Sequence, residues 1–119
     1  MGKKLIWMGS SKKDLKRFPE EVKRNVGYAL HFAQEGVTHP SCKLLKGYGS
    51  GVYEIIEDYN TDTYRAVYLV RFEKIIYVIH AFQKKSKEGI KTPQRELNVI
   101  QERLKKVQEI ENEKKNKRL

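Results

Sequence analysis

The chain has 119 residues, a formal net charge of +10 and 39% hydrophobic residues. This length predicts one domain with a single modest core, and the excess of basic residues favours a polyanionic partner such as nucleic acid, because each neutralised phosphate releases counterions. The single cysteine, Cys42, excludes an internal disulfide framework and fits a reducing cytosol. No apolar run has the length of a membrane span or of a signal-peptide core. We therefore predict a cytoplasmic, nucleic-acid-binding domain. The alternatives are a merely cationic protein and one with an acidic protein partner.

The N-terminal third is predicted to contain a short strand and two helices. Residues 4–8 form the strand, which Gly9 interrupts. The series Ser11-Lys12-Lys13-Asp14 has the form of a capping box and predicts a helix that starts near Ser11 and ends at Pro19. Pro19 suits the first turn of a second helix, with Gly36 as its C-terminal cap. The apolar residues of this helix recur at steps of three and four: Val22, Val26, Ala29, Leu30 and Ala33.

Three further strands are predicted over residues 52–59, 63–72 and 75–82, after a loop over residues 37–51. Their short polar connections indicate hairpins, hence an antiparallel meander. Regular alternation places Arg65 on one face of the middle strand, and it groups His80 with Ile76, Val78 and Phe82 on one face of the last. These last two strands are apolar on both faces, so we expect helices to cover one face fully and the other in part.

The last predicted element is an amphipathic helix with Thr92 as its N-cap and Pro93 at its first position. Its apolar stripe consists of Leu97, Ile100, Leu104 and Val107. Because the pattern ends at Ile110, residues 1–110 are predicted to form the domain and residues 111–119 a basic, frayed tail. The order is β-α-α-β-β-β-α. We therefore predict an α+β domain with an antiparallel sheet of about four strands, two N-terminal helices and one C-terminal helix.

An acidic group of residues, Glu54, Glu57, Asp58 and Asp62, is one candidate for a site. Carboxylates of this kind hold Mg²⁺ in metal nucleases. However, these residues bracket a hairpin turn, where acidic side chains are common, and alternation sends Glu54 and Glu57 to opposite faces. No metal site is therefore predicted.

The second candidate is cationic and comprises Lys43, Lys46, Arg65, His80, Lys84 and Lys85. Arg65 lies on the central strand, where an unpaired guanidinium is costly to bury. It is expected either to pair with a carboxylate such as Glu54 or to face a groove. His80 is either a histidine at the edge of the core or a functional residue at the polar end of its strand.

These residues also carry a resemblance to a known family. The series Lys43-x-Leu45-Lys46-Gly47, Val52-Tyr53-Glu54, Tyr64-Arg65-Ala66-Val67-Tyr68 and His80-Ala81-Phe82-Gln83-Lys84-Lys85-Ser86, followed by Thr92-Pro93, resemble RelE/HigB-type toxins of type II toxin–antitoxin systems. The similarity is to the phage-derived, HigB-like branch and extends from Leu5 to about Leu104. It implies a RelE-like (microbial-RNase-like) fold.

The resemblance implies a ribosome-dependent mRNA endonuclease that uses no metal or other cofactor. The ribose 2′-OH would attack the adjacent phosphate and leave a cyclic phosphate and a 5′-OH. Arg65 would stabilise the phosphorane, and Lys84 would contact the phosphate or the leaving group. The RNA backbone would be bound by Lys43, Lys46 and Lys85.

The resemblance leaves the proton-transfer group open. Two lysines of RelE on the first hairpin strand are replaced here by Glu54 and Ile56, and its C-terminal catalytic tyrosine has no counterpart after Lys85. Histidine-based catalysis would use His80 as base or acid, with Glu54 as a second candidate base. The implied partners are mRNA on the ribosome and a helix-turn-helix antitoxin. The alternatives are a ParE-like toxin that inhibits gyrase and a non-catalytic nucleic-acid- or protein-binding relative of the same fold.

Overall fold

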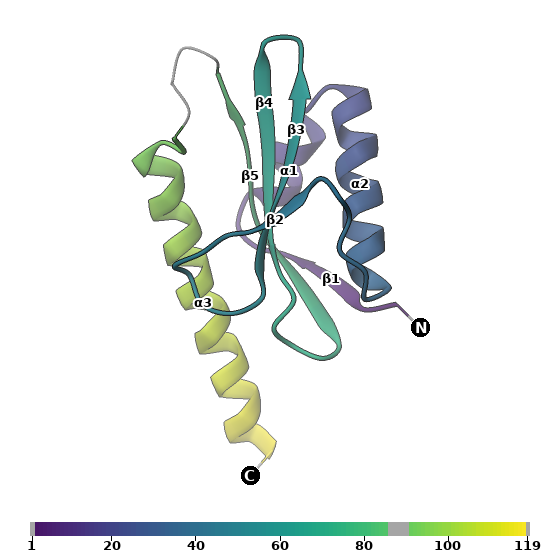
Figure 1. The fold of residues 1–119 in the computed structure, drawn as a ribbon. Coiled ribbons are helices and arrows are strands. Elements are labelled where there is room, and N and C mark those ends of the chain that lie inside the picture. Colours follow the sequence, from purple (N-terminus) through teal and green to yellow (C-terminus); the bar gives the residue numbers. More distant parts are fainter. Residues whose placement is uncertain (1, 86–90, 119) are drawn as a thin grey trace.

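The computed structural model describes residues 2–85 and 91–118, which form three layers (Figure 1). A twisted sheet lies between helices α1 and α2 on one face and helix α3 on the other (Figure 1). The elements are β1 (Lys4–Trp7), α1 (Ser11–Lys16), α2 (Glu20–Gln34), β2 (Cys42–Leu44), β3 (Val52–Tyr59), β4 (Asp62–Leu69), β5 (Ile75–Lys84) and α3 (Gln94–Arg118). The predicted α+β class is confirmed. Residues 86–90 of the predicted polar connection, and Leu119 of the predicted tail, lie outside the described residues.

The sheet has five strands in the order β1-β5-β4-β3-β2. The meander β3-β4-β5 is antiparallel, as predicted, whereas β1 pairs with β5 in parallel. The fifth strand, β2, lies in the segment predicted to be a loop and pairs with β3. It has three residues and no buried side chain, so it lacks the alternating apolar pattern by which a strand is predicted. Its pairing with β3 is what makes it a strand.

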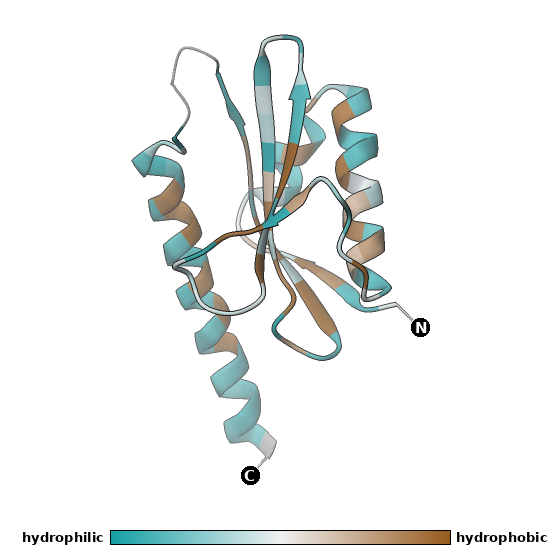
Figure 2. Cartoon of the chain, in the orientation of Figure 1, coloured by the Kyte–Doolittle hydropathy of each residue, from teal (hydrophilic) through white to brown (hydrophobic). Residues whose placement is uncertain are grey.

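Each face of the sheet has its own core. The apolar stripe of α2 is buried against Ile55, Ala66, Tyr68 and Ile76 of the sheet. On the other face, Ile100 and Val107 of α3 are fully buried against residues that include Val67, Leu69 and Ile79. Figure 2 shows the apolar residues of α3 concentrated in its N-terminal half. The prediction that helices cover both faces is therefore confirmed. Within the described residues, no helix combines the length and apolarity that crossing a membrane requires.

Helix α1 begins at Ser11, as predicted, but the N-cap residues of α1 and α2 each differ by one position from those that the sequence patterns predict. The N-cap of α1 is Ser10, whose hydroxyl donates to Asp14 Oδ2 at 2.7 Å. Ser11 is instead buried and donates from Oγ to the carbonyl of Val78 at 3.2 Å, which anchors α1 to β5. Pro19 is likewise the N-cap of α2 rather than its first residue. Both differences lie within the usual uncertainty of helix ends.

Helix α3 differs more from its prediction, because it begins at Gln94 and continues to Arg118. The predicted frayed tail from residue 111 is therefore helical in the structure. Glu111 accepts hydrogen bonds from the hydroxyl of Tyr77 at 2.5 Å and from Lys114 Nζ at 3.1 Å. The contact with Tyr77 holds the C-terminal part of α3 against β5, whereas the contact with Lys114 lies within α3. The apolar stripe of α3 does not predict this hydrogen bond between Tyr77 and Glu111, and so it does not predict the helical continuation past Ile110.

A β-bulge in β5 changes which residues share a face. Val67 pairs with His80 whereas Tyr68 pairs with Val78, so Ile79 is an extra residue without a partner on β4. Before the bulge, Ile76 and Val78 pack in the α2-side core, and after it Ala81 does so, while Phe82 packs on the α3 side. The prediction that His80 and Phe82 share a face with Ile76 and Val78 is therefore wrong. Both lie on the α3 face.

Candidate active site under helix α3

Glu54 and Arg65 form a buried ion pair on the α3 face of the sheet. Adjacent strands β3 and β4 carry them, with Glu54 opposite Val67 and Arg65 opposite Ile56, so the two side chains are diagonal neighbours. Arg65 Nη1 lies 3.2 Å from Glu54 Oε1, and the side chains are only 15% and 7% exposed. Of the two alternatives for Arg65, the structure shows the carboxylate pair.

The pair leaves some of its hydrogen-bonding capacity unused. Within the described part of the chain, Glu54 Oε2 and Arg65 Nε are buried and have no hydrogen-bond partner. Arg65 Nη1 also donates to Thr92 Oγ1, just before α3, at 3.2 Å. Unsatisfied buried polar atoms are destabilising and rare in native proteins. An acceptor and a donor in this condition, one on each member of the ion pair, are suited to binding a polar group of a ligand.

Lysine residues flank this pair on the same face. Lys84 pairs with Thr63, two residues before Arg65 on β4, and is only 6% exposed, which is unusual for a lysine. Lys43 is exposed on β2 and lies opposite Glu54 in the register of β2 and β3. The structure thus brings Lys43, Glu54, Arg65 and Lys84 together on one face. Lys46 and Lys85 are exposed, on the connection after β2 and directly after β5.

His80 is held on both sides of its ring by residues of α3. Its Nε2 lies 2.8 Å from Glu96 Oε1, and its Nδ1 lies 3.2 Å from Arg103 Nη1. Arginine can only donate, so Nδ1 accepts, and Nε2 carries the proton and donates to Glu96. The ring, which stacks on Phe82 with centroids 5.1 Å apart, is 6% exposed. This network assigns the neutral Nε2–H tautomer.

Sequence reasoning missed the contributions of α3 to this site. The sequence pattern predicts a capping role for Thr92 and no role for Glu96 or Arg103. Both charged residues border the apolar stripe, one turn away from Ile100 on either side. Charged side chains at the edge of a buried stripe were the available signal, but such residues more often extend into solvent.

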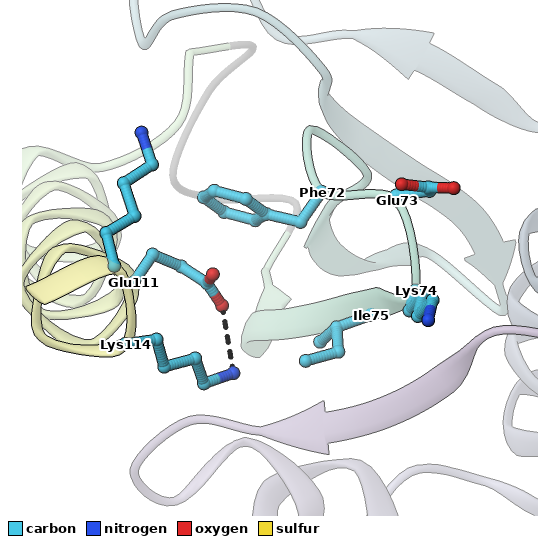
Figure 3. Close-up of a pocket in the computed structure, with 7 residues that line it drawn as sticks. Phe72, Glu73, Lys74, Ile75, Glu111 and Lys114 are labelled. Carbon is cyan, nitrogen blue, oxygen red and sulfur yellow. Dashed lines mark hydrogen bonds and ion pairs between the residues drawn. The ribbon is translucent and has the colours of Figure 1, made fainter. Parts of the chain in front are cut away.

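Two cavities lie away from the Glu54–Arg65 pair. A groove of about 310 Å³ beside His80 is lined by residues that include Asp14 of α1, Gln83 of β5 and Glu96 of α3. A hollow of about 430 Å³ lies between the β4–β5 connection and the C-terminal half of α3, where Phe72, Ile75 and Glu111 line it (Figure 3). None of the predicted site residues lines this hollow. Among the residues that the structure describes, no cluster of three or more His, Cys, Asp or Glu residues could hold a metal ion.

The fold and the site define an α+β protein of RelE architecture with a buried carboxylate–arginine pair under its C-terminal helix. A mutant of the E. coli toxin RelE in the free state, with two arginines replaced by alanine, aligns over 90% of this chain and 99% of its own, with a TM-score of 0.57 and 22% identity. This likeness confirms the predicted fold. A chain of the RelBE2 toxin–antitoxin complex from Mycobacterium tuberculosis covers 71% of this chain and 100% of its own, with a TM-score of 0.47 and 16% identity.

The family is shown by the sequence itself. Residues 13–105 match the family described as Phage derived protein Gp49-like (DUF891), and the chain belongs to this family. Among curated proteins, none is significantly similar to it in sequence. The predicted phage-derived origin agrees with the family description, and the HigB-like branch stays a prediction.

Proposed function

We propose that the protein is the toxin of a type II toxin–antitoxin system and that it cleaves mRNA on the ribosome without a metal. The RelE fold and the Gp49-like family support this proposal. The observation that carries it is the buried Glu54–Arg65 pair beside Lys84, with Glu54 Oε2 and Arg65 Nε lacking partners. Cleavage by a ribose 2′-OH requires a base and cations around one phosphate, which these residues supply.

In the proposed reaction, Glu54 Oε2 takes the proton of the 2′-OH. The O2′–P bond then forms, and Arg65 and Lys84 neutralise the charge that develops on the phosphorane oxygens. The P–O5′ bond breaks, and the ammonium of Lys84 gives its proton to the leaving oxygen. The products are a 2′,3′-cyclic phosphate and a 5′-OH end. We assign the base to Glu54 rather than His80 because both ring nitrogens of His80 are already bound by α3.

Substrate binding would replace a contact present in the free protein. The hydroxyl of Thr92 occupies Arg65 Nη1, so a phosphate oxygen would displace it and engage the guanidinium. The exposed Lys43, Lys46 and Lys85 would hold the RNA backbone. The ribosome would supply the orientation of the mRNA. A helix-turn-helix antitoxin would block this face.

The proposal is tested by inducible expression without any partner, followed by growth measurement and mapping of RNA 5′ ends. We expect growth arrest and new 5′-OH ends within translated frames. Arg65→Gln and Lys84→Gln should each lower cleavage by about 10²-fold or more, because each removes a donor to the phosphorane. Arg24→Gln, which changes an exposed arginine on the outer surface of α2, should leave cleavage as it is.

Other results would direct the function elsewhere. DNA damage signalling with intact mRNA would contradict ribonuclease activity and support a gyrase inhibitor. Salt-sensitive RNA binding with no cleavage on ribosomes would support a non-catalytic relative. Unchanged growth at good expression, with intact transcripts, would contradict the toxin.

A further inference from the structure

The bulge at Ile79 determines which face of the sheet receives Lys84. In a regular strand, residues 76, 78, 80, 82 and 84 share a face. Ile76 and Val78 lie in the α2-side core, so regular alternation would send Lys84 there, away from Arg65. The extra residue reverses the alternation, and Lys84 lies opposite Thr63 on the face of Arg65 and Glu54. The composition of the candidate site therefore depends on this irregularity.

One guanidinium from α3 binds both residues of the bulge. Arg103 Nη1 donates to the carbonyl of Ile79 at 3.0 Å and to Nδ1 of His80 at 3.2 Å. Arg103 Nη2 donates to Ser10 Oγ at 3.1 Å, which ties the same group to the start of α1. The bulge of β5, the start of α1 and helix α3 thus meet at the side chain of Arg103.

The chain leaves room for this guanidinium at Gly9. A Cβ atom at this position would lie 2.7 Å from Cζ and Nε of Arg103, closer than Cβ contacts normally come. Gly9 also has φ of +51°, which favours glycine. The backbone before α1 is therefore shaped to let Arg103 reach the bulge.

His80 completes the link from β5 to α3. Its Nδ1 accepts from Arg103 and its Nε2 donates to Glu96, while the ring stacks on Phe82. The ring can make both hydrogen bonds only as the neutral Nε2–H tautomer, because a proton on Nδ1 would face the guanidinium. The two contacts hold His80 on the α3 face, four residues before Lys84 on the same strand.

We propose that Arg103 and His80 are positioning residues that hold the β5 bulge and so deliver Lys84 to the face of Arg65 and Glu54. His80 acts in this role as the neutral Nε2–H tautomer and moves no proton in the reaction. The part of this inference that concerns cleavage rests on the proposed function. The part that concerns the bulge and the tautomer does not.

The structural part is tested by NMR on the isotope-labelled full chain. Long-range ¹H–¹⁵N correlations report which ring nitrogen of His80 is protonated, and cross-strand NOEs report the pairing of Val67 with His80 and of Tyr68 with Val78. We expect a protonated Nε2 and an unprotonated Nδ1. In Arg103→Gln we expect a mixture of tautomers and loss of the bulge NOEs, whereas Lys106→Gln, on an exposed position of α3, should change neither. A charged ring or an Nδ1–H tautomer at neutral pH, or bulge NOEs that persist in Arg103→Gln, would overturn the proposal.

The catalytic part is tested by cleavage of a ribosome-bound message. Arg103→Gln should lower the cleavage rate by about 10²-fold, as expected for a misplaced catalytic group. His80→Asn keeps an acceptor for Arg103, so it should retain much more activity than His80→Ala and a pH–rate profile of wild-type shape. Equal inactivity of the two His80 variants, with the bulge NOEs intact, would show that His80 itself transfers the proton. If the wild-type protein cleaves no RNA, the proposed function fails, and the NMR result alone decides the positioning role.

Discussion

Glu54 and Arg65 form the buried ion pair of the candidate site. Their neighbourhood on β3 and β4 follows from the short hairpin between these strands, which is evident in the sequence. What the sequence left open was whether Arg65 pairs or faces a groove, and the structure shows the pair while leaving one polar atom on each partner unsatisfied. A buried pair of this kind is costly to break from one side, because the remaining charge loses its partner.

We expect a double-mutant cycle to detect this coupling. Glu54→Ala and Arg65→Ala should each lower the free energy of unfolding by about 3–5 kcal/mol. The double variant should cost about 1–3 kcal/mol less than the sum of the single variants, since neither charge is then left alone. Urea denaturation followed by circular dichroism measures all four proteins. Strictly additive effects would mean that the pair contributes nothing beyond its separate side chains.

Tyr77 gives the protein a sensitivity to alkaline pH. Burial, and secondarily the hydrogen bond to Glu111, raise the pKa of its hydroxyl. The unfolded chain ionises at a pKa of about 10, whereas the folded chain keeps the proton to higher pH. This contribution to stability is therefore fully present below about pH 10 and is lost as the pH rises above it.

Tyr77→Phe removes this titration and one hydrogen bond. We expect the free energy of unfolding to fall by about 1 kcal/mol at pH 7 and to depend less steeply on pH above about 10. The matched control is Tyr28→Phe, because Tyr28 is exposed on α2. Denaturation curves at several alkaline pH values provide the measurement. An unchanged slope would contradict the role of Tyr77.

At the scale of elements, β5 and α3 depend on each other. The apolar periods of both are visible in the sequence, and both elements exist as predicted. The bulge in β5 has no sequence pattern, because it is fixed by Arg103, which lies 24 residues after Ile79 in the chain. Regular alternation therefore failed from His80 onward. Glu96 and Arg103 also make contacts with β5 that the amphipathic pattern of α3 does not predict, because their partners are distant in sequence.

Two glycine-to-alanine substitutions should change the free energy of unfolding in opposite directions. Gly9→Ala should lower the free energy of unfolding by about 1–3 kcal/mol, since alanine is strained at positive φ and its Cβ would meet Arg103. Gly27→Ala should raise it by about 0.5–1 kcal/mol, because Gly27 lies within α2 with open space around it. Thermal and urea unfolding measure both. Equal effects of the two substitutions would contradict both the backbone strain expected at position 9 and the tight approach of Arg103.

On the scale of the whole molecule, the sequence shows a net charge of +10, and the fold brings several of the basic residues to one face of the sheet. Helices α1 and α2 cover one face of the sheet, and α3 covers the other. The candidate site lies on the α3 face, where the start of α3 approaches β4 and the C-terminal end of β5. Lys43 reaches the same face only because β2 adds a strand beside β3. The resemblance to RelE/HigB-type toxins implied that these lysines contact RNA, but the sequence did not predict the strand β2 that carries Lys43.

The contribution of these lysines is measurable as a salt dependence. Binding of an RNA with 2′-deoxyribose at the cleavage position should weaken linearly in a plot of log affinity against log salt concentration. Lys43→Gln and Lys46→Gln should each reduce the slope by about 0.7, the value for one phosphate contact on a single strand. Lys105→Gln, at an exposed position of α3, should leave the slope unchanged. Fluorescence anisotropy over a salt series measures it, and unchanged slopes for Lys43 and Lys46 would remove them from the RNA path.

The sequence by itself determined the class of fold, the order of the helices and long strands, the net charge and most of the residues on the site face. These features depend on local spacing, on turn chemistry and on composition, all of which can be read along the chain. Only the tertiary structure decided the parallel pairing of β1, the strand β2, the helical continuation past Ile110 and the bulge that moves His80 and Lys84 to the α3 face. Each of these depends on a partner distant in sequence, such as Glu111 for Tyr77 or Arg103 for Ile79, and such pairings leave no local period.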